Sequence, residues 1–153
     1  MFNGTVQPEW LDHNGHMNVA YYVLAFDLAT DEMYDGWGLG FDYPERGFSV
    51  YTLGMNVDYR AEMLEGEPFR VESLLVDFDH KRVHYFHVMY RGESDKVVAT
   101  NECLAMNVSL ATRRSADFPP DVYAKLEDVK TDVVPVGFGR KLHRHQHNLC
   151  RSG

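Results

Sequence analysis

An apolar segment near the start of the chain limits its possible folds more than any other feature. The residues from Val19 to Phe26 are all aliphatic or aromatic, and Asn18 before them is a suitable N-cap. Acidic residues then recur every four positions and share one helical face: Asp27, Asp31 and Asp35. Gly36 and Gly38 would end the helix. Because its first two turns are apolar on nearly all sides, we expect a long helix that other structure surrounds.

The sequence after this helix favours strands. Together with a short strand near the start of the chain, strand-like segments are expected at 2–7, 48–59, 69–78, 83–91 and 97–110. The short connections between the later segments favour antiparallel neighbours. Pro119 and Pro120 open a short helix that runs to about Val129. The sequence therefore predicts an α+β fold, in which a curled antiparallel sheet of about five strands wraps around the long central helix.

The length and charge of the chain narrow its class. With 153 residues it can bury a core without metals or disulfides. We expect one domain over residues 1–130, followed by a loose tail over residues 131–153. The formal net charge is -8, and no dense run of Lys and Arg lies within the predicted domain. Since duplex-binding domains usually present a basic face, nucleic acid is not an expected partner.

The cysteines and the start of the chain suggest a compartment. Cys103 falls within a predicted strand and Cys150 lies near the end of the chain, so neither a zinc site nor a disulfide is expected. The first residues show no basic region followed by an apolar run. No apolar stretch approaches the roughly 20 residues of a membrane span. We therefore expect a cytoplasmic protein that has no membrane partner.

The loop ahead of the long helix carries the residues best suited to chemistry. Asp12 precedes the predicted cap at Asn18, and Gly15 between them lets the chain turn back. The first amides of a helix have no intrahelical partner and carry the positive end of the helix dipole. Such amides stabilise the oxyanion of a tetrahedral intermediate, and a carboxylate beside them can attack a thioester or activate water. An Asp in such a turn also commonly caps backbone amides, so the pattern alone leaves both roles open.

The segment from Asp12 to Asn18 resembles the Asp-x-x-Gly-His-x-Asn motif of hotdog-fold acyl-CoA thioesterases of the 4-hydroxybenzoyl-CoA type. The order of the predicted elements also resembles this family over residues 5–125. The resemblance implies a hotdog fold, hydrolysis of an acyl-CoA thioester without a cofactor, and Asp12 as the catalytic carboxylate. It further implies that the backbone N–H of Val19 polarises the thioester carbonyl. By the same resemblance Asn18 and His16 belong to the catalytic group, although the pattern allows His16 an equal structural role in the loop.

A narrower resemblance concerns the acyl group. The 4-hydroxybenzoyl enzyme has Pro-Ala after its aspartate where this chain has His13 and Asn14, which argues against the same aromatic substrate. The segments 8–31 and 111–120 are similar to the betainyl-CoA thioesterases of carnitine breakdown. Betaine carries a quaternary ammonium, which aromatic faces bind well. We therefore expect substrate contacts from Gly15 and from three rings: Trp10, Tyr21 and Tyr22.

Other candidate sites carry weaker signals. The phosphates of CoA need basic groups, and two adjacent pairs are available: Lys81 with Arg82, and Arg113 with Arg114. His84 and His87 are three positions apart on a predicted strand, so they point to opposite faces and make a poor metal pair. A metal site in the tail is disfavoured because its histidines have no fixed backbone: His143, His145 and His147. We expect no metal and no cofactor.

Two alternatives to a thioesterase follow from the same fold. The hydratases resembling it use an Asp and a His separated by four residues, with a proline between them. Asp12 and His16 are separated by three, without a proline, which disfavours a hydratase. A hotdog protein that binds acyl-CoA without turning it over stays open, because fold does not fix function. We also expect a homo-oligomer, a dimer or a dimer of dimers, because a curled sheet leaves edge strands to pair.

Overall fold

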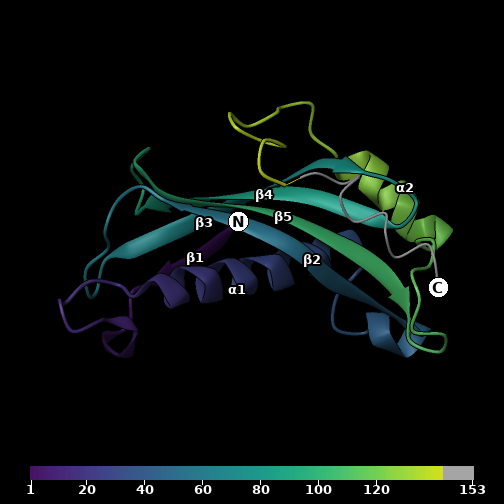
Figure 1. Cartoon of the computed structure of the whole chain (residues 1–153), viewed down its shortest axis with the longest axis horizontal. Coiled ribbons are helices and arrows are strands. Elements are labelled where there is room, and N and C mark those ends of the chain that lie inside the picture. The colour runs from purple at the N-terminus through teal and green to yellow at the C-terminus, as the bar shows by residue number, and fades with distance from the viewer. Residues whose placement is uncertain (143–153) are drawn as a thin grey trace. The chain divides into compact units, whose positions relative to one another are not determined.

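A computed structural model describes residues 1–142 of the chain (Figure 1). Within these residues two helices and five strands follow one another in this order: β1 (Phe2–Thr5), α1 (Val19–Trp37), β2 (Phe48–Tyr59), β3 (Pro68–Phe78), β4 (Arg82–Arg91), β5 (Val97–Ser109) and α2 (Pro120–Val129). Each helix and strand expected from the sequence is present, and its bounds agree to within two residues. Two short 3-10 turns were not expected: Pro8–Trp10 and Tyr43–Arg46.

The strands form one five-stranded sheet in the order β1-β3-β4-β5-β2. β1 pairs antiparallel with β3, and Phe2 lies opposite Val71. The connection from β3 to β4 is a tight turn closed by Asp79. Its carboxylate accepts hydrogen bonds from the main-chain N–H groups of Lys81 (2.9 Å) and Arg82 (2.7 Å). One long helix with a five-stranded sheet confirms the predicted α+β architecture.

Both ends of α1 follow from the sequence. The Asn18 side-chain oxygen accepts a hydrogen bond from the Ala20 N–H (2.9 Å), as an N-cap does. At the other end Gly38 adopts a φ of +79°, a left-handed conformation that glycine tolerates best. The Leu39 N–H then turns back to the carbonyl of Tyr34 (2.9 Å). The helix therefore ends where the two glycines predicted.

The faces of α1 differ in burial. The acidic side chains that share one face are exposed, as expected: Asp27, Asp31 and Asp35. Ala25, Phe26 and Ala29 face the core and are buried. Some apolar side chains nevertheless remain exposed: Val19 (59%), Leu24 (40%) and Leu28 (39%). The apolar surroundings that we expected on nearly all sides of the helix are therefore incomplete within a single chain.

The first of two compact units comprises Met1–Met33, Val57–Ser73 and His87–Asn101. Large apolar side chains from its helix, strands and loops form its core: Met17, Phe26, Met63, Phe69 and Met89. His87 is fully buried, with Nδ1 2.7 Å from the Ser73 hydroxyl and Nε2 2.8 Å from the Thr30 hydroxyl. Burial lowers the pKa of His87 to about 3, so this imidazole is neutral. This unit contains the whole Asp12 loop.

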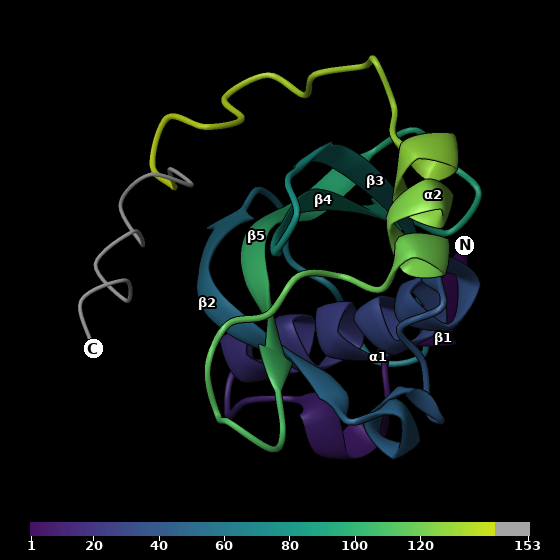
Figure 2. The same ribbon diagram turned by 90° about the vertical axis from the view of Figure 1, so that its right-hand side faces the viewer.

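The second unit comprises Tyr34–Asn56, Leu74–Phe86 and the described chain from Glu102 onward. Its helix α2 lies beside β3 and β4 (Figure 2), and Tyr123 stacks on His80 with ring centroids 4.9 Å apart. Helix α2 also buries two apolar side chains completely: Val122 and Leu126. This unit packs through its own aromatic and aliphatic contacts.

The segment after α2 packs within the second unit, against β4 and β5. The Gly139 N–H donates to the carboxylate of Glu102 (2.6 Å), which also pairs with His84 (2.9 Å), and both of these side chains are buried. Residues 143–153 lie outside the described residues, so the expected boundary at residue 130 stays a prediction. Within residues 1–142 no helix is long and apolar enough to cross a membrane.

Candidate active site

The loop that carries Asp12 folds back on itself as a short antiparallel pair. Leu11 and Met17 form an isolated β-bridge. The Asp12 N–H donates to the His16 carbonyl (2.8 Å), and the Gly15 N–H donates to the Asp12 carbonyl (3.1 Å). Gly15 lies at the reversal with a φ of +79°, which explains why a glycine is needed there. The chain therefore brings Asp12 back beside the residues that lead into α1.

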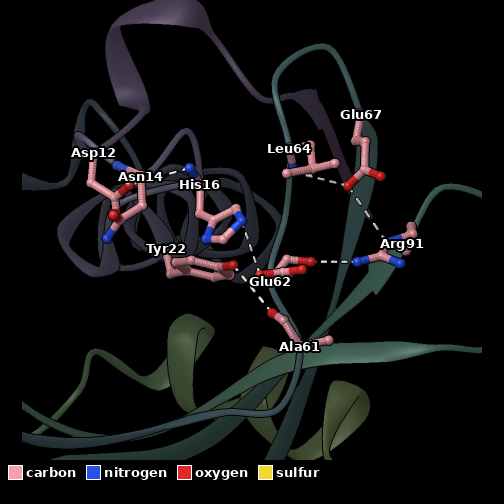
Figure 3. A network of polar contacts seen from close by, with 9 residues as sticks. All are labelled: Asp12, Asn14, His16, Tyr22, Ala61, Glu62, Leu64, Glu67 and Arg91. Carbon is pink, nitrogen blue, oxygen red and sulfur yellow. Dashed lines mark hydrogen bonds and ion pairs between the residues drawn. The ribbon is translucent and has the colours of Figure 1, made fainter.

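The Asp12 carboxylate is oriented by main-chain donors of its own loop. Its Oδ1 accepts hydrogen bonds from the N–H groups of Asn14 (2.8 Å) and His16 (3.2 Å), as Figure 3 shows. The hydrogen bond from His16 holds the pKa of Asp12 below its ordinary value of 3.8, and the bond from Asn14 acts in the same direction. The carboxylate is thus ionised at neutral pH. Its Oδ2 takes part in neither bond.

The start of α1 lies directly after this loop. The Asn18 N–H donates to the Trp10 carbonyl (2.8 Å), which ties the helix entry to the start of the loop. Asn18 caps Ala20 with its side chain and Tyr21 with its carbonyl (3.0 Å). Neither cap uses the Val19 N–H, the group predicted to polarise a carbonyl. The Asp12 loop therefore leads directly into the helix start that carries the Val19 amide, whose role stays a prediction.

His16 has a partner that the sequence did not reveal. Its Nε2 lies 3.1 Å from the Glu62 carboxylate, and the two side chains point toward each other in Figure 3. The His16 backbone also forms a β-bridge with Leu64, and the next amide, Met17 N–H, donates to the Met63 carbonyl (2.8 Å). Residues 62–64 lie far from the motif along the chain, in a turn without periodic pattern, so no local signal pointed to them.

The aromatic candidates occupy different environments. Trp10 and Tyr21 are partly buried and stack with centroids 5.7 Å apart and an interplanar angle of 13°. Tyr22 is only 3% exposed, and its hydroxyl donates to the Ala61 carbonyl (3.2 Å). Tyr59 contacts the Tyr22 ring edge-on, and its hydroxyl donates to the Val19 carbonyl (3.0 Å). Trp10 and Tyr21 thus stay partly open to a ligand, whereas Tyr22 packs in the core.

The basic candidates for CoA phosphates belong to the second unit. Arg82 is buried, and its guanidinium pairs with Asp79 at 2.7 Å, which already neutralises its charge. Arg113 and Arg114 are exposed. A role for these residues in binding the phosphates of CoA stays a prediction.

The histidines within residues 1–142 form no cluster that could bind a metal. His84 pairs with Glu102 and His87 with Ser73 and Thr30, so each has partners of its own. Among residues 1–142 no group of three potential metal ligands comes together. The tail histidines lie outside the described residues: His143, His145 and His147.

Comparison with known proteins defines the class. Residues 6–126 match the Thioesterase-like superfamily, and the chain belongs to this family of hydrolases. It is 36% identical over 140 residues to the betainyl-CoA thioesterase of Pseudomonas aeruginosa, an alignment that covers 88% of each chain. It is 35% identical over 121 residues to the L-carnitine dehydrogenase/betainyl-CoA thioesterase of Ruegeria pomeroyi. That alignment covers 79% of this chain and 24% of the larger protein.

Solved structures agree with the fold. A Staphylococcus aureus protein in complex with CoA superimposes with a TM-score of 0.83 at 28% identity, covering 93% of this chain and 92% of that one. A Pseudomonas putida protein gives a TM-score of 0.78 at 31% identity, with 93% and 94% covered. The predicted hotdog fold and the resemblance to the 4-hydroxybenzoyl-CoA type of thioesterase are both confirmed.

Proposed function

We propose that this chain is an acyl-CoA thioesterase that hydrolyses a small acyl-CoA to the free acid and CoA. One observation carries the proposal: the ionised carboxylate of Asp12 stands in a loop that folds back against the entry to α1. Membership in the thioesterase family supports it, as does similarity to a protein in complex with CoA. Asp12 is the catalytic group, and Val19 supplies the amide at the helix start.

The chemistry divides between these two groups. The thioester carbonyl oxygen accepts a hydrogen bond from the Val19 N–H, where the helix dipole stabilises developing negative charge. Asp12 either attacks the carbonyl carbon or takes a proton from the attacking water. When Asp12 attacks, the carbon–sulfur bond breaks to leave a mixed anhydride on Asp12, which water then hydrolyses to the free acid and the original carboxylate. When water attacks, the same bond breaks as the tetrahedral intermediate collapses to the free acid. In both routes the thiolate of CoA leaves and takes up a proton. Asn18 caps the helix so that its first amide stays in place, and Gly15 keeps the loop free of a side chain.

The preferred acyl group is proposed to be the betainyl group. The identity of 36% with a betainyl-CoA thioesterase is the main support. The stacked pair of Trp10 and Tyr21 adds a physical reason, because its outer ring faces attract a trimethylammonium group. Tyr22 is buried, so we give it a supporting role through its hydrogen bond to Ala61 rather than a contact with the substrate.

A second copy of the chain is proposed to cover the exposed apolar side chains and the open strand edge. Apolar side chains on α1 are exposed: Val19, Leu24 and Leu28. β2 lies at one end of the sheet and exposes three large side chains spaced four residues apart, which places them on one face of the strand: Tyr51, Met55 and Tyr59. Burying such side chains and pairing an open strand edge both favour association. A dimer, or a dimer of dimers, follows.

Steady-state hydrolysis with detection of the released thiol tests the substrate. Betainyl-CoA is compared with 3,3-dimethylbutanoyl-CoA, in which carbon replaces the charged nitrogen while size and branching stay the same. Cation recognition on aromatic faces predicts a kcat/KM about tenfold higher for betainyl-CoA. Benzoyl-CoA and a long-chain acyl-CoA should be poorer still. Equal kcat/KM values for the charged and neutral isosteres would contradict cation recognition, while the proposal of a small-acyl-CoA thioesterase would stand.

A further inference from the structure

A small polar network supports the Asp12 loop from outside it (Figure 3). The Glu62 carboxylate pairs with His16, whose own main-chain N–H donates to Asp12 Oδ1. The Glu62 main-chain carbonyl accepts a hydrogen bond from the Arg91 guanidinium. Glu62 is thus held through its backbone while its side chain reaches the residue that orients the catalytic carboxylate.

The turn that carries Glu62 is fixed at several points. Arg91 also forms an ion pair with Glu67 (3.5 Å), and the Glu67 carboxylate accepts the Leu64 N–H (3.0 Å). The Tyr22 hydroxyl donates to the Ala61 carbonyl on the other side. These bonds come from β4, α1 and the turn itself, so the backbone around Glu62 is well anchored. An anchored carboxylate can restrict the motion of a partner that lies on a loop.

We propose that Glu62 is a positioning residue for the thioesterase reaction, acting through His16 to keep the Asp12 loop in its reactive arrangement. The inference rests on the proposed function. It assigns Glu62 no contact with the substrate. His16 connects the two, because its imidazole meets Glu62 while its main-chain N–H and carbonyl both bond to Asp12.

The exposure of the pair argues that its main effect is on the loop rather than on overall stability. The His16 and Glu62 side chains are 40% and 63% exposed. Polar contacts this open to water contribute little to folding. A comparable small gain in the population of the reactive loop nevertheless appears directly in kcat, because it acts on the catalytic group and not on substrate affinity.

The test compares Glu62→Ala with Glu65→Ala, which removes the same charge from an exposed position of the same turn. We expect Glu62→Ala to lower kcat about three- to fivefold at unchanged KM, and Glu65→Ala to leave both parameters as in the wild type. Glu62→Gln keeps a hydrogen-bonding group for either tautomer of His16, so kcat should recover to within about 1.5-fold. Equal losses for Glu62→Ala and Glu65→Ala overturn the proposal, as does a Gln variant that loses as much as the Ala variant.

A double-mutant cycle tests whether the effect passes through His16. In a His16→Ala background, Glu62→Ala should cause no further loss of kcat, because the connection is already broken. The same three- to fivefold loss in that background would show that Glu62 acts by another route.

Amide NMR provides a readout that needs no turnover. In Glu62→Ala the amide signals of Asn14 and His16, which donate to Asp12, should shift, whereas in Glu65→Ala they should stay in place. Unmoved signals in both variants overturn the positioning role. If the wild type hydrolyses no thioester while these signals shift, the proposed function fails and the structural connection between Glu62 and the loop still stands.

Discussion

The main-chain N–H of His16 lies 3.2 Å from Oδ1 of Asp12, while the Asp12 N–H lies 2.8 Å from the His16 carbonyl oxygen. The two residues therefore bond to each other in both directions across the turn at Gly15. A carboxylate held in this way is both ionised and oriented, and both hydrogen bonds lie within its own loop. The histidine of the motif thus acts on the aspartate through its backbone, while its ring contacts Glu62.

The depressed pKa of Asp12 predicts how activity depends on pH. Donors from His16 and Asn14 favour the carboxylate, so this group protonates only below its ordinary pKa of 3.8. Activity that requires the carboxylate should therefore persist as pH falls through 3.8 and be lost below that value. The same sign applies to stability, since the contribution of Asp12 is present above the unfolded pKa and disappears as pH falls through the folded one. An NMR titration of the Asp12 carboxyl carbon checks this, and a pKa above 3.8 would contradict it.

Gly15 and Gly36 make a matched pair for testing the turn. A methyl group meets no atom within 4 Å at either position, but only Gly15 has a positive φ, of +79°. Gly15→Ala should lower the free energy of unfolding by about 1–2 kcal/mol, because an L-residue is strained there. Gly36→Ala, at the end of α1, should raise it by about 0.4–1 kcal/mol through a less flexible unfolded chain. Urea unfolding measures both, and equal effects would remove the conformational explanation.

Substitutions at Trp10 and Tyr22 distinguish a residue that contacts the substrate from one that stabilises the fold. Trp10→Leu should lower kcat/KM for betainyl-CoA about three- to tenfold relative to the neutral isostere, since a cation-binding face is lost. Tyr22→Phe removes a hydroxyl buried against Ala61, so it should lower the free energy of unfolding by about 1 kcal/mol without changing that ratio. A changed ratio in Tyr22→Phe, or an unchanged one in Trp10→Leu, would reverse the assignment.

The exposed apolar side chains of α1 predict association. Light scattering of the wild type at micromolar concentration should give at least twice the chain mass of 17.6 kDa. Leu28→Glu replaces an exposed apolar side chain of α1, one turn from Leu24, with a charge and should shift the protein toward the monomer. Val134→Glu changes the charge equally at another exposed apolar residue and serves as the control. An active wild-type monomer would rule out a dimer as the working form.

Local patterns explain how much of the fold and site the sequence could predict. The apolar run closed by acids at every fourth position located α1, and the Asn18 cap set its first residue. The strand-like residues that follow the glycine-rich region located β2 to the residue, because strand preference depends only on neighbouring positions. The motif likewise identified the turn at Gly15 and the aspartate in it.

Contacts between distant segments could not be predicted in this way. Glu62 pairs with His16 because two loops lie side by side in the folded chain. The hydrophobic periodicity of either segment does not predict this contact. Because the start of the helix is almost wholly apolar, its sequence also does not show that Tyr22 faces the core whereas Tyr21 stays partly exposed. Similarly, a Lys-Arg pair in the sequence does not reveal that Arg82 is already bound to Asp79.

Turnover of betainyl-CoA by Asp12→Asn tests the central claim most directly. The amide keeps an oxygen that can accept the Asn14 and His16 N–H bonds, so the loop should fold as in the wild type, which circular dichroism and the amide signals can verify. It cannot act as a nucleophile or a base at neutral pH, and kcat should fall about 10²–10⁴-fold. A folded Asp12→Asn protein that hydrolyses betainyl-CoA, or any better thioester, within about threefold of the wild-type rate would contradict a catalytic role for Asp12.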